Sequence, residues 1–211
     1  MIELHILNAH GKFTPYQKQI KSAFASSAQR IFEVLPVSEV DVVFQLSPEA
    51  VISEFGIGGY SPSGHLIVIS ADPDNPNFAN SLENEFFTTL GHELHHSKRW
   101  QTVGYGSTLL EALVTEGLAC HFEAELRPGT IPFYASALEE TAISDLLAKA
   151  IPSFSDVNYG HAEWFLGQSD EIPLYAGYTL GFELVSRYIS KQGRKASRLY
   201  DEPAEHFRSL A

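Results

Sequence analysis

The hydrophobic pattern of this 211-residue chain mixes strand and helix periods in its first third and is mainly helical afterwards, and that change of period constrains the fold more than any other feature. Before about residue 80, apolar segments of strand length predominate. We expect strands at residues 2–8, 39–46 and 66–69. Between the first two, apolar side chains recur every three or four positions, which predicts a helix over residues 15–34. Thr14 and Pro15 are typical of its start.

From residue 81 onward the apolar spacing is mostly helical. We expect helices near residues 82–101, 107–126, 134–149, 174–191 and 203–210. The Gly-rich residues 56–64 are expected to form turns, and residues 72–80 a loop. No linker-like stretch separates the two parts. We therefore predict one α+β domain over 1–211, with an α/β lobe over about 1–80 and a helical lobe over about 81–211.

Composition limits the classes of partner. The formal net charge of −12 disfavours nucleic acid, because such binding depends on Lys and Arg that neutralise phosphates. Cys120 is the only cysteine, which excludes an intramolecular disulfide and a Cys-rich metal site. The sequence has no run of about 18 apolar residues and no signal-peptide pattern at its start. We expect a cytoplasmic protein with no membrane contact.

The segment His92-Glu93-Leu94-His95-His96 fits the pattern H-E-x-x-H. On a helix, residues four apart differ by about 40° around the axis, so His92 and His96 point the same way and can share one zinc ion. Glu93 lies beside them, where its carboxylate can take a proton from a water activated by zinc. The alternative is a solvated helix with clustered histidines.

Catalytic zinc usually has three protein ligands, and Glu116 is our candidate for the third. It lies in the middle of an apolar helix face, where a carboxylate is costly unless it is paired or bound to a metal. A buried salt bridge is the alternative. Glu123 returns to nearly the same face and is a candidate to accept the ring N–H of a ligand histidine. It is equally well explained as a half-exposed carboxylate at the helix end.

Other histidines are weaker candidates. His95 lies three residues from His92 and competes with it as a ligand, but no glutamate is placed to act as base in that arrangement. We therefore interpret His95 as a neighbour of the site. His121 and His161 are isolated in the sequence, and an isolated histidine is more often structural or exposed than a ligand.

These residues resemble the gluzincin pattern, in which H-E-x-x-H on one helix is followed by a glutamate ligand on the next. Glu116 follows His96 by 20 residues, a spacing similar to that of thermolysin-like enzymes. More narrowly, the chain resembles a largely uncharacterised family of predicted zinc-dependent proteases. The matching segments are residues 92–96, 109–119 and 176–181.

The resemblance implies a zincin-like fold, in which a small mixed sheet packs against the active-site helix and its edge strand lines the substrate cleft. Residues 58–69 are the candidate rim. The chain departs from the thermolysin-like arrangement because no Asp follows Glu116 closely, and Cys120 lies four residues on. In similar enzymes a Tyr or His donates to the oxyanion. Tyr178 is the candidate here, with Tyr175 and His161 as alternatives, and a packed core aromatic is the competing interpretation of Tyr178.

The sequence therefore predicts a zinc-dependent hydrolase, most simply a metallopeptidase that acts on a peptide or protein, with Glu93 as general base. One alternative is a zinc-dependent amidase that acts on a small molecule. Another is a non-catalytic binding or regulatory module that zinc stabilises. A closed shell of four ligands favours the last, because structural zinc sites leave no open position.

Overall fold

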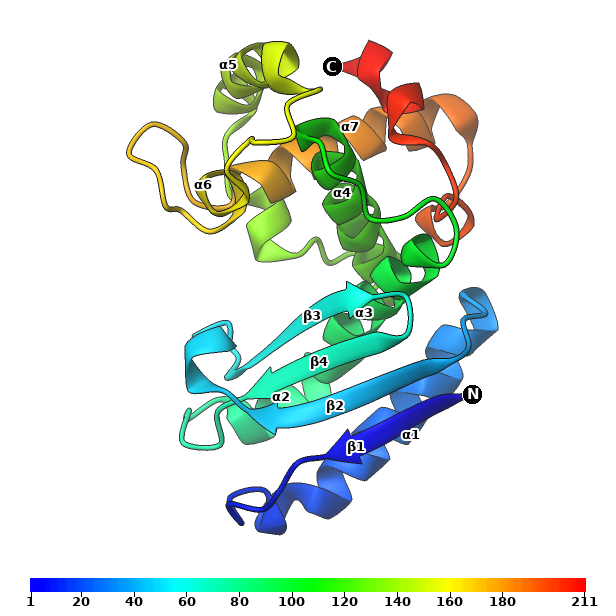
Figure 1. Cartoon of the computed structure of the whole chain (residues 1–211), viewed down its shortest axis with the longest axis vertical. Coiled ribbons are helices and arrows are strands. Elements are labelled where there is room, and N and C mark those ends of the chain that lie inside the picture. Colours follow the sequence, from blue (N-terminus) through cyan, green and yellow to red (C-terminus); the bar gives the residue numbers. More distant parts are fainter. The chain divides into compact units, whose positions relative to one another are not determined.

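The computed structural model describes residues 1–211 and divides them into two compact units, Met1–Gln101 and Thr102–Ala211 (Figure 1). The first unit contains a four-stranded mixed sheet with helices, and the second is helical. The α+β class expected from the change of period is confirmed. The expected lobe boundary near residue 80 is too early, because the next two helices pack within the first unit.

The sheet has the strand order β1-β2-β4-β3. Its strands are β1 (Ile2–Ile6), β2 (Val40–Leu46), β3 (Ile57–Ser63) and β4 (Leu66–Ala71). β1, β2 and β4 are parallel, whereas β3 runs antiparallel to β4 and forms an edge of the sheet. The strands expected at residues 2–8, 39–46 and 66–69 are confirmed as β1, β2 and β4.

β3 lies where the sequence predicted turns, and this prediction was wrong. Gly58 and Gly59 belong to the strand and pair with β4. A Cβ atom at Gly58 would lie 2.6 Å from the carbonyl oxygen of Ala50. A Cβ atom at Gly59 would lie 2.5 Å from Oε1 of Glu93. Glycine is therefore needed at these two positions because other parts of the molecule approach the strand backbone closely.

Three helices cover one face of the sheet (Figure 1). They are α1 (Gln17–Val34), α2 (Phe78–Asn84) and α3 (Phe86–Trp100). α1 follows a short 3-10 turn at Thr14–Tyr16, close to its expected start. The single helix expected over 82–101 is instead two helices that meet at Glu85, and α2 begins inside the expected loop 72–80. α3 packs against β3, β4 and α1, which makes it the central helix of the unit.

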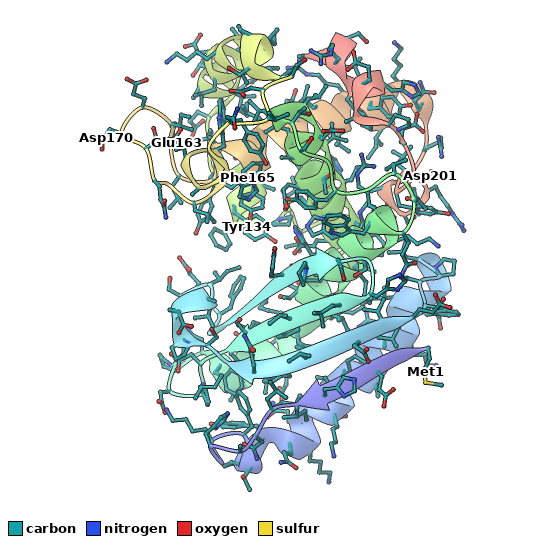
Figure 2. All side chains as sticks on the ribbon, in the orientation of Figure 1. Met1, Tyr134, Glu163, Phe165, Asp170 and Asp201 are labelled. Carbon is teal, nitrogen blue, oxygen red and sulfur yellow. The ribbon has the colours of Figure 1, made fainter.

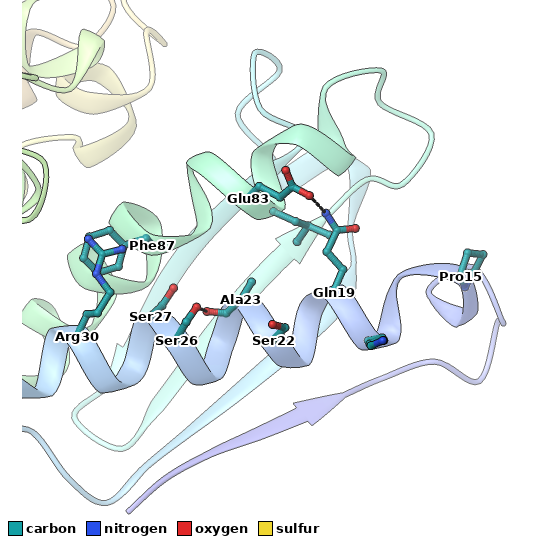
Figure 3. Close-up of a pocket in the computed structure, with 11 residues that line it drawn as sticks. Pro15, Gln19, Ser22, Ala23, Ser26, Ser27, Arg30, Glu83 and Phe87 are labelled. Atoms are coloured by element: carbon teal, nitrogen blue, oxygen red, sulfur yellow. Dashed lines mark hydrogen bonds between the residues drawn. The ribbon is translucent and has the colours of Figure 1, made fainter.

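A groove of about 580 Å³ runs between α1 and the pair α2 and α3 (Figure 3). The guanidinium of Arg30 lies 3.7 Å from the ring centroid of Phe87. The amide of Gln19 donates to the Glu83 carboxylate. Between these contacts α1 presents only small side chains, such as Ser26, and this leaves the space open.

The second unit contains α4 (Leu109–Leu126), α5 (Glu140–Ala150), α6 (His161–Phe165) and α7 (Ala176–Gln192). The helices expected near 107–126 and 174–191 are confirmed as α4 and α7. The expected helix 134–149 is a 3-10 turn, Phe133–Ser136, followed by α5. The expected helix 203–210 is the 3-10 helix Ala204–Leu210, and α6 was not predicted. No helix of either unit is both long and apolar enough to cross a bilayer.

α4 and α7 pack closely because both contain a glycine at the crossing. A Cβ atom on Gly117 would collide with the backbone of Gly181, and one on Gly181 would collide with the carbonyl of Leu113. α4 begins with a capping box in which Thr108 accepts from the backbone N–H of Glu111 and the Glu111 side chain accepts from that of Thr108.

Glu202 ties the C-terminal segment to α7. Its carboxylate accepts from the Tyr188 hydroxyl at 2.7 Å and from Arg194 at 2.9 Å, and it lies 2.6 Å from Nδ1 of His206. Burial opposes ionisation of Glu202, but the hydrogen bonds from His206, Tyr188 and Arg194 outweigh it and lower the pKa of the carboxyl. Burial and the bond to Glu202 raise the pKa of Tyr188 to about 12.

Candidate functional site

α3 carries the whole H-E-x-x-H motif. The ring centroids of His92 and His96 are 4.6 Å apart and the rings are nearly perpendicular, at 84°. Both side chains are buried, and so is that of His95. The expectation that a helix brings His92 and His96 to one side is confirmed. Buried imidazoles side by side suit a shared cation far better than a solvated helix face does.

The carboxylate of Glu93 lies beneath the edge strand β3. The Ser61 hydroxyl is 2.8 Å from Oε2 of Glu93 and 2.9 Å from its backbone carbonyl, so its one hydrogen is shared between the side chain and the helix backbone. Glu93 also fills the space that a side chain at Gly59 would need. The carboxylate is only 5% exposed, so this partnership compensates a costly burial.

Two further bonds hold β3 to the end of α3. Trp100 donates its ring N–H to the carbonyl of Ser61 at 3.2 Å, and the Gln101 amide donates to the carbonyl of Gly64 at 2.7 Å. These contacts fix the register between the strand and the helix. Sequence reasoning missed Ser61, because it lies in a Gly-rich stretch that was interpreted as turns.

In the second unit, Glu116 lies on α4 and is 5% exposed. Its Oε1 atom accepts a hydrogen bond from the hydroxyl of Tyr105. Burial, the charge of Glu116 and the hydrogen bond to it raise the pKa of the Tyr105 phenol well above its usual value. The phenol is therefore protonated at neutral pH and acts as a donor. No sequence pattern indicated this partner, which lies in the loop before the helix.

Glu123 lies on the same face of α4 and is also buried. It accepts at Oε1 from the hydroxyl of Tyr134 at 2.5 Å. Between the two carboxylates lies Cys120, and burial, followed by the charges of Glu123 and Glu116, raises the pKa of its thiol well above the usual value. The thiol is therefore neutral and unreactive at pH 7. The interpretation of Glu123 as half-exposed was wrong.

Tyr178, on α7, is half-buried among aromatic rings. Its ring centroid is 5.0 Å from that of Tyr134 and 5.1 Å from that of Phe165, and both of these residues are labelled in Figure 2. Tyr175 precedes α7 with a φ angle of 66°, an uncommon value for a residue that is not glycine. These rings hold Tyr178 in a packed cluster. Its role in chemistry stays a prediction.

The two isolated histidines have aromatic neighbours within the second unit. His121 stacks on the ring of Phe182, and its Nε2 lies 2.9 Å from the carbonyl of Phe182. His161 stacks on Phe165, and its Nδ1 lies 3.1 Å from the hydroxyl of Tyr159. Burial lowers the pKa of His121, which favours its neutral form. The interpretation of both histidines as structural or exposed stays a prediction.

The predicted site residues, which are three ligands, a base and an oxyanion donor, come from both units. The first unit supplies the His92 and His96 rings and the Glu93 carboxylate, and the second supplies Glu116 and Tyr178. Two imidazole nitrogens with one carboxylate oxygen are a usual donor set for catalytic zinc. A separate group of possible ligands, Glu3, His5 and Asp41, lies exposed on the sheet of the first unit. Unlike the buried histidines of α3, these three residues are exposed to solvent.

Comparisons with known proteins give one match. No curated protein matches the sequence, and no solved structure matches it either. The profile of a family described as "Predicted Zn-dependent protease (DUF2268)" matches residues 17–209. Because this match covers nearly all of the chain and agrees with the resemblance found in the sequence, the chain belongs to this family of predicted zinc-dependent proteases.

Proposed function

We propose that this protein is a zinc-dependent peptidase with a zincin-like fold, in which His92, His96 and Glu116 bind the metal. The observation that carries the proposal is the arrangement on α3. Two buried imidazoles lie side by side, and the next carboxylate along the helix is held under an edge strand by Ser61. A purely structural zinc site has no need of such a carboxylate.

Glu93 is assigned as the general base. When bound, zinc polarises a carbonyl group and lowers the pKa of water toward about 7. Glu93 takes a proton from the attacking water and delivers it to the nitrogen of the leaving amine. The Tyr178 phenol donates a hydrogen bond to the carbonyl oxygen as negative charge develops there. His95 is left as a neighbour of the ligands.

The position of β3 favours a peptide over a small amide as the substrate. β3 is an edge strand, and it contacts the helix that carries Glu93. An extended peptide can add to such an edge through backbone hydrogen bonds. Its scissile bond would then lie near the side chains of α3. Peptide bonds in an extended chain are therefore the substrate class we assign.

The first experiment measures zinc in the purified protein and in His96→Ala, followed by peptide hydrolysis by the wild type and Glu93→Gln. We expect about one zinc per chain, lost in His96→Ala and retained in Glu93→Gln, with turnover abolished in both variants. Full turnover by Glu93→Gln would remove the assigned base. Stoichiometric zinc without hydrolysis of any peptide or small amide would favour the zinc-stabilised binding module.

A further inference from the structure

Two buried carboxylates on α4 each accept a hydrogen bond from a phenol, and only one of them is an assigned ligand. Tyr105 donates to Glu116, and Tyr134 donates to Glu123. We propose that Tyr105 is a positioning residue, which fixes the Glu116 carboxylate in the orientation that binds the metal. This inference rests on the proposed function, because it takes Glu116 as the third ligand.

The loop before α4 is built to bring Tyr105 to this position. The Thr115 hydroxyl donates to the carbonyl of Tyr105 at 2.9 Å, so the residue next to Glu116 holds the backbone of its partner. Gly104 and Gly106 have φ angles of +86° and +99°, which favour glycine and turn the chain back toward the helix. These contacts lie within the second unit.

The start of α4 holds the same loop from its other end. The Glu111 carboxylate accepts from the backbone N–H of Ser107 at 2.8 Å and of Thr108 at 2.9 Å. A side chain at Gly106 would collide with Glu111, so the loop passes this carboxylate closely. With the Tyr105 carbonyl and the N–H groups of Ser107 and Thr108 held by α4, the Tyr105 backbone has little freedom and its phenol stays directed at Glu116.

The chemical consequence follows from the freedom of a glutamate side chain. Glu116 has several rotatable bonds, and binding a metal requires one orientation of its carboxylate. The phenol donates to Oε1 and so restricts the rotation of the carboxylate. Hydrogen-bond partners that orient metal ligands typically contribute 10- to 100-fold in metal affinity or activity. Tyr105 does not itself touch the metal or the substrate.

The bond between Tyr134 and Glu123 supplies a matched control. It has the same chemistry, on the same face of the same helix, and Tyr→Phe removes one hydroxyl at either position. The experiment measures zinc affinity by chelator competition at fixed pH, and the visible absorption of the cobalt-substituted protein. We expect Tyr105→Phe to weaken zinc binding about 10- to 100-fold and to change the cobalt spectrum. Tyr134→Phe should weaken zinc binding less than Tyr105→Phe does, because Glu123 is not an assigned ligand.

Wild-type affinity and spectrum in a folded Tyr105→Phe overturn the proposal, as does a loss confined to Tyr134→Phe. Should Tyr105→Phe fail to fold, Thr115→Val decides, because it removes the bond to the Tyr105 backbone and leaves the phenol in place. Weakened zinc binding in that variant supports the proposal, and unchanged binding overturns it. Glu116→Gln distinguishes a failure of the proposed metal site from a failure of the role proposed for Tyr105. Unchanged affinity in that variant refutes Glu116 as a ligand, whereas lost affinity leaves the proposed site standing whatever Tyr105→Phe does.

Discussion

Gly59→Ala tests whether the space beneath β3 sets the position of Glu93. The added Cβ would lie 2.5 Å from Oε1 of Glu93, whereas ordinary contact begins at 3.4 Å. The carboxylate must therefore retreat by about 0.9 Å, the difference between these two distances. A misplacement of about 1 Å in a catalytic group can cost about 100-fold in rate. That corresponds to about 2.7 kcal/mol of activation free energy.

The same substitution should leave the fold intact. Gly59 is exposed, and the atoms that its Cβ meets belong to the end of a flexible side chain. Replacing glycine by alanine within a strand also removes backbone freedom from the unfolded chain. We therefore expect the free energy of unfolding to change by less than about 1 kcal/mol. Zinc content should equal that of the wild type, because neither histidine is touched.

Gly58→Ala is the matched control, one residue away on the same strand. Its Cβ would lie 2.6 Å from the backbone carbonyl oxygen of Ala50, which cannot turn aside. We expect a loss of about 1–3 kcal/mol in stability, typical of overpacking. The assay compares kcat on a peptide that the wild type cleaves with urea unfolding of each variant. Wild-type kcat in a folded, zinc-loaded Gly59→Ala would refute the reasoning about Glu93.

Three further outcomes are expected. Ser61→Ala removes the donor to Glu93, so kcat should fall about tenfold while zinc content stays at the wild-type value, and an unchanged kcat would count against Ser61. Gly181→Ala should lower the free energy of unfolding in urea by about 3 kcal/mol, because its Cβ meets backbone at the α4 and α7 crossing, and wild-type stability would contradict that packing. The pKa of Glu202 is lowered on folding, so the ionised carboxylate stabilises the folded state. This contribution is fully present above the unfolded pKa of about 4.3 and is lost as the pH falls through the lower, folded-state pKa. Glu202→Gln should therefore lower the melting temperature more at pH 7 than at pH 3, and a difference independent of pH would refute the assignment.

Local patterns predicted the elements whose signal repeats along the chain. The three strands of the parallel part and α4 and α7 were found because apolar positions recur at the period of the element. The His92 and His96 pair was found because four-residue spacing fixes geometry on one helix. Glu116 was found by the cost of a carboxylate on an apolar face, and it is buried as expected.

The partners of these residues were not predictable, because they arise from tertiary contacts. Ser61 reaches Glu93 from a strand 32 positions earlier, and Tyr105 reaches Glu116 from a loop 11 positions earlier. Neither spacing has a periodicity that a sequence pattern can report. Tyr134 is similar, because the residues between it and Glu123 are irregular. Hydrogen-bond donors to functional carboxylates thus need a structure for their identification.

The glycines near β3 show why the missed strand was difficult to recognise. Gly56 has a φ angle of +68°, a conformation that belongs to a turn, whereas Gly58 and Gly59 lie in extended backbone that any residue adopts. The sequence shows the three glycines as one cluster, although backbone conformation requires the first and close approach requires the other two. An alanine at Gly56 is strained by its own backbone, and one at Gly59 acts through Glu93 alone. A glycine that lacks a positive φ and lies beside a buried carboxylate therefore indicates that the carboxylate occupies the volume a Cβ atom would need. Here that carboxylate is the proposed general base, Glu93.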